Sequence, residues 1–196
     1  MAISDRKLRL AGAGLAVAVT AIVVPVLVLG RGPQRQAAAG APVPELSGKA
    51  VRGGKLDLKR LRGHIVLLSF LNFRAQTSGK GDPSLSQSTF LRSMETQHTR
   101  FGLHTIVIDA TEVAGAGRLG RTDVLNWTYN WNLAPPIAVL PDEDGTIARR
   151  FAITETPTTF LIDQHGIINK RWHGFVLVAK LDIAIRALEG RRPGSH

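Results

Sequence analysis

Apolar residues are concentrated in two long runs in the C-terminal three quarters of the chain. His64–Phe73 is rich in Ile, Val, Leu and Phe, which is typical of a strand buried on both faces. Leu103–Ala110 repeats the pattern and predicts a second central strand. Shorter runs predict one more strand and a terminal hairpin, over Ile137–Leu140 and over Thr158–Asp163 paired with Ile167–Trp172.

Helical spacing fills the intervals between these strands. Asp82 followed by Pro83 combines an N-cap with a first-turn proline, and predicts a helix to about His98. Val124, Trp127 and Trp131 share a face and predict a helix from Leu119 to about Trp131, with both tryptophans in the core. The remaining predicted elements are a hairpin of Lys49–Val51 with Lys55–Asp57, a helical turn over Gly145–Phe151 and a final helix over Val176–Leu188. Strands that alternate with helices and end in a hairpin indicate an α/β fold with a mixed sheet.

A separate apolar segment precedes this domain. Leu10–Leu29 has no charged residue over a length that can cross a bilayer as a helix, and Arg6, Lys7 and Arg9 favour a cytoplasmic N-terminus. We therefore expect a cytoplasmic tail at residues 1–9 and a transmembrane signal anchor, in contact with membrane lipid, at residues 10–29. A linker at residues 30–44 would lead to an extracytoplasmic domain at residues 45–190, followed by a C-terminal tail at residues 191–196. A signal peptide cleaved near Ala37–Ala39 is the alternative, and it also places the domain outside the bacterial cytoplasm.

The charge and the cysteine count exclude several functions. The net charge is +10, but the first 35 residues hold five basic residues and one acid, which leaves about +6 for the rest. No basic run is interleaved with aromatic residues, so we expect no nucleic-acid partner. The chain has no cysteine, which rules out disulfides, thiolate nucleophiles and thiolate metal sites.

Two segments resemble a known family. The stretch 141–163 (PDEDGTIARRFAITETPTTFLID), and Ala41–Pro42 with the stretch 53–63 (GGKLDLKRLRG), are similar to the thioredoxin-like redoxins of the TlpA/ResA type and their AhpC/TSA peroxiredoxin relatives. This resemblance covers about Ala41–Leu188. It implies a thioredoxin-like fold, with a mixed central sheet flanked by helices.

The same resemblance implies where an active site would lie. Redox-active members carry Cys-x-x-Cys after the first central strand, and here those positions are Ala75 and Ser78, with Gln76 and Thr77 between them. We therefore expect no catalytic residue. Thr156–Pro157 matches the family's cis-proline loop, which would face Gln76 and Thr77 and bind an extended protein segment. The alternative is that this loop is kept because the fold needs it, and that it binds no partner.

Two further patterns carry less weight. Gly115–Gly120 fits G-x-G-x-x-G, but four residues separate it from the preceding strand, so we interpret it as a loop that leads into a helix. The six histidines show no metal-ligand spacing, and we expect neither a metal site nor a cofactor.

The sequence therefore predicts a membrane-anchored thioredoxin-like protein with a non-catalytic binding or scaffold role at the cell envelope. An oxidoreductase or antioxidant role, in which a partner supplies the thiols, remains the alternative hypothesis.

Overall fold

The computed structural model describes residues 37–74 and 83–190. The predicted transmembrane segment and signal-peptide core, the N-cap Asp82 and the C-terminal tail lie outside this part of the chain. Within it, no helix is long and apolar enough to cross a membrane.

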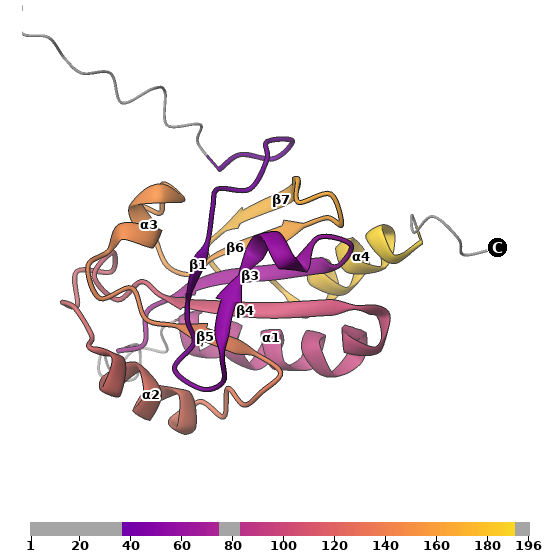
Figure 1. The fold of residues 1–196 in the computed structure, drawn as a ribbon. Coiled ribbons are helices and arrows are strands. Elements are labelled where there is room, and N and C mark those ends of the chain that lie inside the picture. Colours follow the sequence, from indigo (N-terminus) through magenta and orange to yellow (C-terminus); the bar gives the residue numbers. More distant parts are fainter. Residues whose placement is uncertain (1–36, 75–82, 191–196) are drawn as a thin grey trace, which may run out of the picture. The chain divides into compact units, whose positions relative to one another are not determined.

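A five-stranded mixed sheet forms the centre of the domain (Figure 1). Its strands lie in the order β5-β4-β3-β6-β7, where β3, β4 and β5 are parallel and β6 and β7 are antiparallel to their neighbours. These strands are Ala138–Leu140 (β5), Leu103–Asp109 (β4), Ile65–Leu71 (β3), Thr158–Ile162 (β6) and Ile168–His173 (β7). All seven residues of β3 are buried, Ser69 included, as its dense apolar run predicted.

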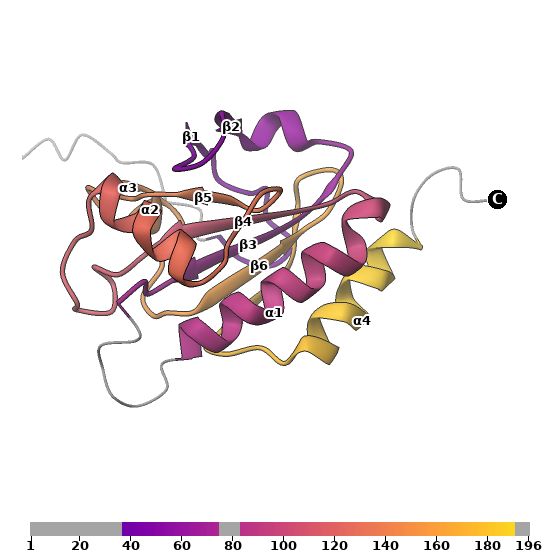
Figure 2. The same cartoon turned by 90° about the horizontal axis from the view of Figure 1, so that it is seen from below.

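Helices cover both faces of the sheet. Figure 2 shows α1 (Pro83–His98) and α4 (Val178–Glu189) side by side on one face. The core on that face also includes Val124 of α2 (Arg121–Asn130). The opposite face packs against α3 (Thr146–Arg150) and against Leu46 and Leu58, which flank the small β1–β2 sheet. Short 3-10 helices cover Leu58–Leu61 (η1) and Thr99–Phe101 (η3).

The first hairpin differs from its prediction. Its strands are Ser47–Lys49 (β1) and Lys55–Asp57 (β2), so β1 ends two residues earlier than expected. The reason lies at Val51, whose N–H donates to the carbonyl of Val139 in β5 rather than to β2. Trp131 is buried and stacks on Phe73 with 4.9 Å between ring centroids, so its predicted core position is confirmed.

The first described residues lie along β7. Ile168 donates its N–H to the carbonyl of Ala41 at 2.9 Å and accepts from the N–H of Gly40 at 2.8 Å. Arg171 adds a side-chain bond from Nη1 to the carbonyl of Ala37 at 3.0 Å. The chain therefore enters the domain at the edge strand of the sheet, close to the turn between β6 and β7.

Candidate functional site

The cis-proline loop lies beside the end of β3. The Thr156–Pro157 peptide bond is cis, as the sequence predicted. Because Phe70 of β3 pairs with Thr158 of β6, Pro157 is adjacent to the point where β3 ends. Ala75, Gln76, Thr77 and Ser78 lie outside the described residues, so their placement opposite Pro157 stays a prediction.

Thr156 has backbone groups that no other described residue uses. The carbonyl of Pro157 accepts from the N–H of Gly174 at 2.8 Å, and the hydroxyl of Thr158 donates to the carbonyl of Glu155 at 2.8 Å. In the described part of the chain, neither the N–H nor the C=O of Thr156 has a hydrogen-bond partner. One backbone donor and one acceptor of the same half-buried residue are therefore open to water or to another chain.

Exposed apolar side chains follow this loop. Gly174 is bonded to Pro157, and the next residues include Phe175, which is 41% exposed, and Leu177, which is 55% exposed. Phe90 of α1 packs against the Phe175 ring at 5.1 Å between centroids. We call Thr156, Pro157, Phe175 and Leu177 the cis-proline edge. Sequence reasoning missed the two apolar residues, although the short run Phe175–Leu177 directly after a strand was a usable signal.

A buried glutamine fixes the backbone behind this edge. Gln87 of α1 is fully buried, and its Oε1 accepts from the N–H of Val176 at 2.8 Å. This bond ties the segment after β7 to α1. The apolar side chains of the cis-proline edge therefore project from a backbone that two helices and a strand hold in place.

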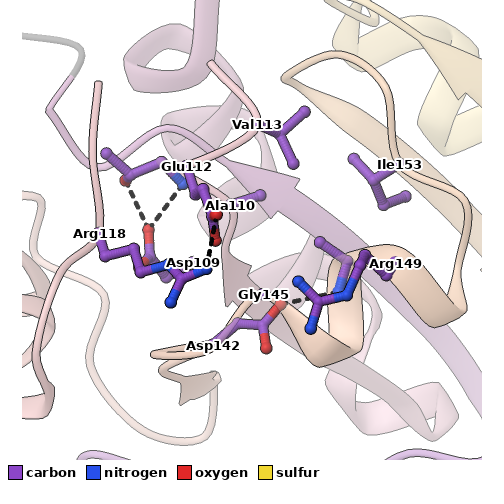
Figure 3. Close-up of a pocket in the computed structure, with 11 residues that line it drawn as sticks. Asp109, Ala110, Glu112, Val113, Arg118, Asp142, Gly145, Arg149 and Ile153 are labelled. Carbon is purple, nitrogen blue, oxygen red and sulfur yellow. Dashed lines mark hydrogen bonds and ion pairs between the residues drawn. The ribbon is translucent and has the colours of Figure 1, made fainter. Parts of the chain in front are cut away.

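A second candidate site lies at the carboxyl ends of β4 and β5, where side chains from two neighbouring strands meet around a cavity of about 220 Å³ (Figure 3). Asp109 ends β4 and is 3% exposed. Its Oδ1 accepts from the N–H of Thr111 at 3.0 Å and from the hydroxyl of Thr111 at 2.5 Å. Burial, with a smaller contribution from Asp142, raises the pKa of Asp109 to about 6, although the hydrogen bonds from Thr111 and the charge of Arg74 act in the opposite direction.

The other acidic residues of this cavity are bonded differently. Asp142 follows β5, and its two carboxylate oxygens accept from the N–H groups of Ile147 and Ala148 at 2.9 and 2.7 Å. Burial raises the pKa of Asp142, while those two bonds lower it. Glu112 accepts from Arg118 at 2.9 Å, which holds the pKa of Glu112 below its usual value. We call this cavity the Asp109 pocket.

One hydroxyl connects the Asp109 pocket to the end of β3. The Thr111 hydroxyl that donates to Asp109 also accepts from the N–H of Phe73 at 2.9 Å. Phe73 precedes the predicted Cys-x-x-Cys positions by two residues. The Asp109 pocket is therefore linked to the segment that directly follows β3 by two hydrogen bonds through one hydroxyl.

The remaining sequence motifs have structural roles in the described part of the chain. Gly115 and Gly117 adopt positive φ angles in the loop before α2, as expected for a connecting loop. His98 is buried, with Nδ1 at 2.9 Å from Glu189 and Nε2 at 2.9 Å from Asp182, and it links α1 to α4. Across residues 37–74 and 83–190, no three His, Asp or Glu side chains are grouped closely enough to hold a metal ion.

Comparison with known proteins agrees with this geometry. No family model matches the chain. The thiol-disulfide oxidoreductase ResA of Bacillus thuringiensis is 26% identical over 127 residues, which are 65% of each chain. The thiol:disulfide interchange protein DsbE of Xylella fastidiosa is 43% identical over 53 residues, which are 27% of this chain and 25% of that protein.

The fold is also similar to that of a solved structure of another protein. The thioredoxin-family thiol:disulfide interchange protein of Chlorobium tepidum superposes with a TM-score of 0.61 at 20% identity, over 78% of this chain and 99% of that one. The mixed sheet and the cis-proline loop beside its central strand thus define a thioredoxin-like fold. The sequence is similar to ResA and DsbE, which confirms the resemblance to the redoxins. Neither cysteine of a Cys-x-x-Cys motif is present.

Proposed function

We propose that this protein is a non-catalytic thioredoxin-like binding protein at the bacterial cell envelope, and that it binds an extended polypeptide segment along the cis-proline edge. The observation that carries the proposal is that the backbone N–H and C=O of Thr156, beside Pro157, have no partner within residues 37–74 and 83–190, in a chain without cysteine.

The chemistry of the edge suits an extended segment. A donor and an acceptor on one residue match the pairing that a neighbouring β-strand provides. The exposed parts of Phe175 and Leu177 offer apolar surface to side chains of such a strand. Backbone pairing would supply affinity, and the apolar contacts would supply selectivity.

The chemistry of thiol exchange is absent from the chain. Exchange requires a thiolate that attacks a disulfide sulfur and then forms a mixed disulfide. Alanine has no nucleophile, and the serine hydroxyl does not cycle through a disulfide. The sequence therefore supports binding without turnover.

Location at the envelope rests on the sequence. The uncharged segment 10–29 follows three basic residues, which supports a single-pass anchor with the domain outside. A carbonate wash of membranes tests the anchor. The full chain should stay with the membrane, whereas a soluble form that begins near Gly40 would contradict it.

The names of the relatives favour one alternative, in which the protein takes part in thiol–disulfide exchange with a partner that supplies every thiol. An insulin-reduction assay with the full chain separates the two roles. The binding proposal expects no turnover above a control without protein. Turnover above that control would overturn it.

Site-specific crosslinking tests the edge itself. A photoreactive residue at position 175 of the full chain should crosslink to polypeptides in intact cells, whereas the same residue at the exposed position Ile183 on α4 should give only background. Thr156→Pro removes the backbone N–H and should lower the yield about tenfold, because one lost hydrogen bond is worth roughly 1–1.5 kcal/mol.

Thr156→Ala is the matched control, because it removes the side chain and keeps the backbone N–H. Its crosslinking yield should equal that of the unmodified chain. Equal yields from Thr156→Pro and Thr156→Ala, or equal yields at positions 175 and 183, would overturn the proposal.

A further inference from the structure

The Asp109 pocket contains carboxylate oxygens with unused capacity to accept hydrogen bonds. Both bonds to Asp109 end on Oδ1, and no donor of the described residues bonds Oδ2. Oε2 of Glu112 is buried and also has no partner. A buried carboxylate oxygen without a donor is unfavourable, so a group that donates hydrogen bonds would be stabilised here.

The charge of the lining favours a cation. Three carboxylates and two guanidinium groups face the cavity, from Asp109, Glu112, Asp142, Arg118 and Arg149, and they leave one net negative charge. Arg118 is paired with Glu112, and Arg149 donates to the hydroxyl of Thr146 at 3.2 Å. Both guanidinium groups thus already have a partner, while Oδ2 of the buried Asp109 has no donor among the described residues.

Part of the cavity wall is apolar. Val113, Ala148 and Ile153 line it beside the charged groups. Gly145 closes another side, where a Cβ atom would lie 2.5 Å from Oε2 of Glu112 and 2.9 Å from Nη1 of Arg149. The absence of a side chain at position 145 therefore leaves room for both of these groups. A cavity of about 220 Å³ is smaller than the roughly 300–1,000 Å³ of sites for drug-sized ligands, so it suits a short group.

We propose that the Asp109 pocket binds a short alkylammonium group, with the ammonium against Oδ2 of Asp109 and Oε2 of Glu112 and the hydrocarbon stem against Val113, Ala148 and Ile153. The group comes either from a free small amine or from a lysine side chain of a polypeptide, since the recognised chemistry is the same. This site does not depend on the peptide-binding role of the cis-proline edge.

The raised pKa of Asp109 supports this site. The fold keeps an ionised carboxylate buried at neutral pH, which lowers its stability, and a bound cation would remove that penalty. Binding would also reach the end of β3, because Thr111 bonds both Asp109 and the N–H of Phe73.

The test is a titration of the full chain in non-ionic detergent at pH 7.5, followed by amide NMR shifts. Added n-butylammonium should shift the amide signals of Thr111, Ala148 and Phe73 along one saturable curve. Neutral n-butanol and anionic butyrate should leave them unchanged. No saturable shift with n-butylammonium, or an equal shift with n-butanol, would overturn the proposal.

Variants assign the binding to the named oxygens. Asp109→Asn and Glu112→Gln should each raise the apparent Kd for n-butylammonium at least about tenfold, because hydrogen bonds to charged groups are worth roughly 1.5–3 kcal/mol. Glu45→Gln is the control. It removes one exposed carboxylate that pairs with Lys59 outside the pocket, and it should leave the Kd unchanged. If Asp109→Asn does not fold, Glu112→Gln still decides the outcome, and a Kd equal to that of Glu45→Gln would overturn the proposal.

A second ligand identifies the source of the ammonium. Nα-acetyl-lysine amide carries the same head on a peptide backbone. Equal saturable shifts with this compound and with n-butylammonium would assign the site to a lysine side chain. Shifts with n-butylammonium alone would assign it to a free amine.

Discussion

The cis-proline edge and the Asp109 pocket occupy the same end of the sheet but use opposite kinds of chemistry. The cis-proline edge presents backbone groups and apolar side chains, and none of its four residues titrates. The Asp109 pocket presents five charged side chains around a cavity. ResA and DsbE, to which this chain is similar, are named as thiol–disulfide enzymes, whereas this chain has no cysteine and carries ionisable groups at the carboxyl ends of β4 and β5.

The two regions also differ in their effect on folding stability. Solvent-facing backbone groups cost little stability because they can bond water, and exposed apolar side chains cost little because they are also exposed in the unfolded chain. A carboxylate buried at the end of β4 lowers stability whenever it is ionised. The comparison therefore predicts that substitutions in the Asp109 pocket change folding, while substitutions at the cis-proline edge change binding alone.

Asp109→Asn should have the largest effect on stability. The folded pKa of about 6, against an ordinary value of 3.8, means that the folded state binds the proton more tightly than the unfolded chain. Stability should therefore fall as the pH rises from about 4 to 6 and stay constant above that range. At pH 7.5 the variant should be more stable than the parent by about 3 kcal/mol, and near pH 4 the two should agree.

Urea unfolding at the two pH values measures this difference. Asp142, Glu112, Arg74, Arg118 and Arg149 surround the group in both proteins, so their titration largely cancels in the comparison. If the parent protein and Asp109→Asn were equally stable at pH 7.5, burial of the Asp109 carboxylate would not lower stability. The Asp109 pocket and the cis-proline edge would then not differ in their cost to folding.

Thr111→Val should have the next largest effect, because it cuts the connection between Asp109 and the segment that follows β3. It leaves the N–H of Phe73 without its acceptor and removes one donor from Asp109. We expect a loss of about 1–3 kcal/mol of stability, and a pKa of Asp109 above 6, since the bond from Thr111 lowers that pKa. Thr111→Ser, which keeps the hydroxyl, is the control.

NMR titration of the Asp109 carboxyl carbon measures the second outcome. The pKa of Asp109 should rise in Thr111→Val and stay near the parent value in Thr111→Ser. A pKa that is the same in all three proteins would mean that the hydroxyl does not couple the pocket to the end of β3.

Phe175→Ser should have the smallest effect on stability. The side chain is 41% exposed and contacts Phe90 on its inner side, so we expect a change within about 1 kcal/mol. The same variant should reduce crosslinking from a photoreactive residue at position 177. If Phe175→Ser strongly destabilised the protein and left crosslinking unchanged, the cis-proline edge would contribute to folding and not to binding, which would contradict the comparison.

The sequence predicted the parts of this structure that depend on neighbouring residues. The dense apolar run of β3, the helix that begins at Pro83 and the cis bond in the stretch 154–163 all follow from local pattern or from the family resemblance. The first hairpin was shifted because the N–H of Val51 bonds to β5, a partner 88 residues away that hairpin rules do not include.

The Asp109 pocket could not be predicted in the same way. Asp109 is the last residue of β4 and Glu112 follows it. Asp142 and Gly145 follow β5, about thirty residues later in the chain. Only the pairing of these parallel strands brings them together, with Val107 opposite Val139. The rule that polar residues at the carboxyl ends of adjacent parallel strands converge would have pointed to this place, but not to the cavity or to the unpaired oxygens.

The attachment of residues 37–43 to β7 has a mechanical consequence. The bonds between Gly40, Ala41 and Ile168 lie near the turn of the β6–β7 hairpin, at the Ile162–Ile168 pair. The Thr158–His173 pair next to the cis-proline edge lies five residues further along β7, which is about 16 Å. A pull on residues 37–43 is therefore borne by β7, through the bonds of Ile168 near the turn and the bond from Arg171 to Ala37. The bond from the N–H of Gly174 to the carbonyl of Pro157 is not among them, so such a load enters the sheet through bonds other than those of the cis-proline edge.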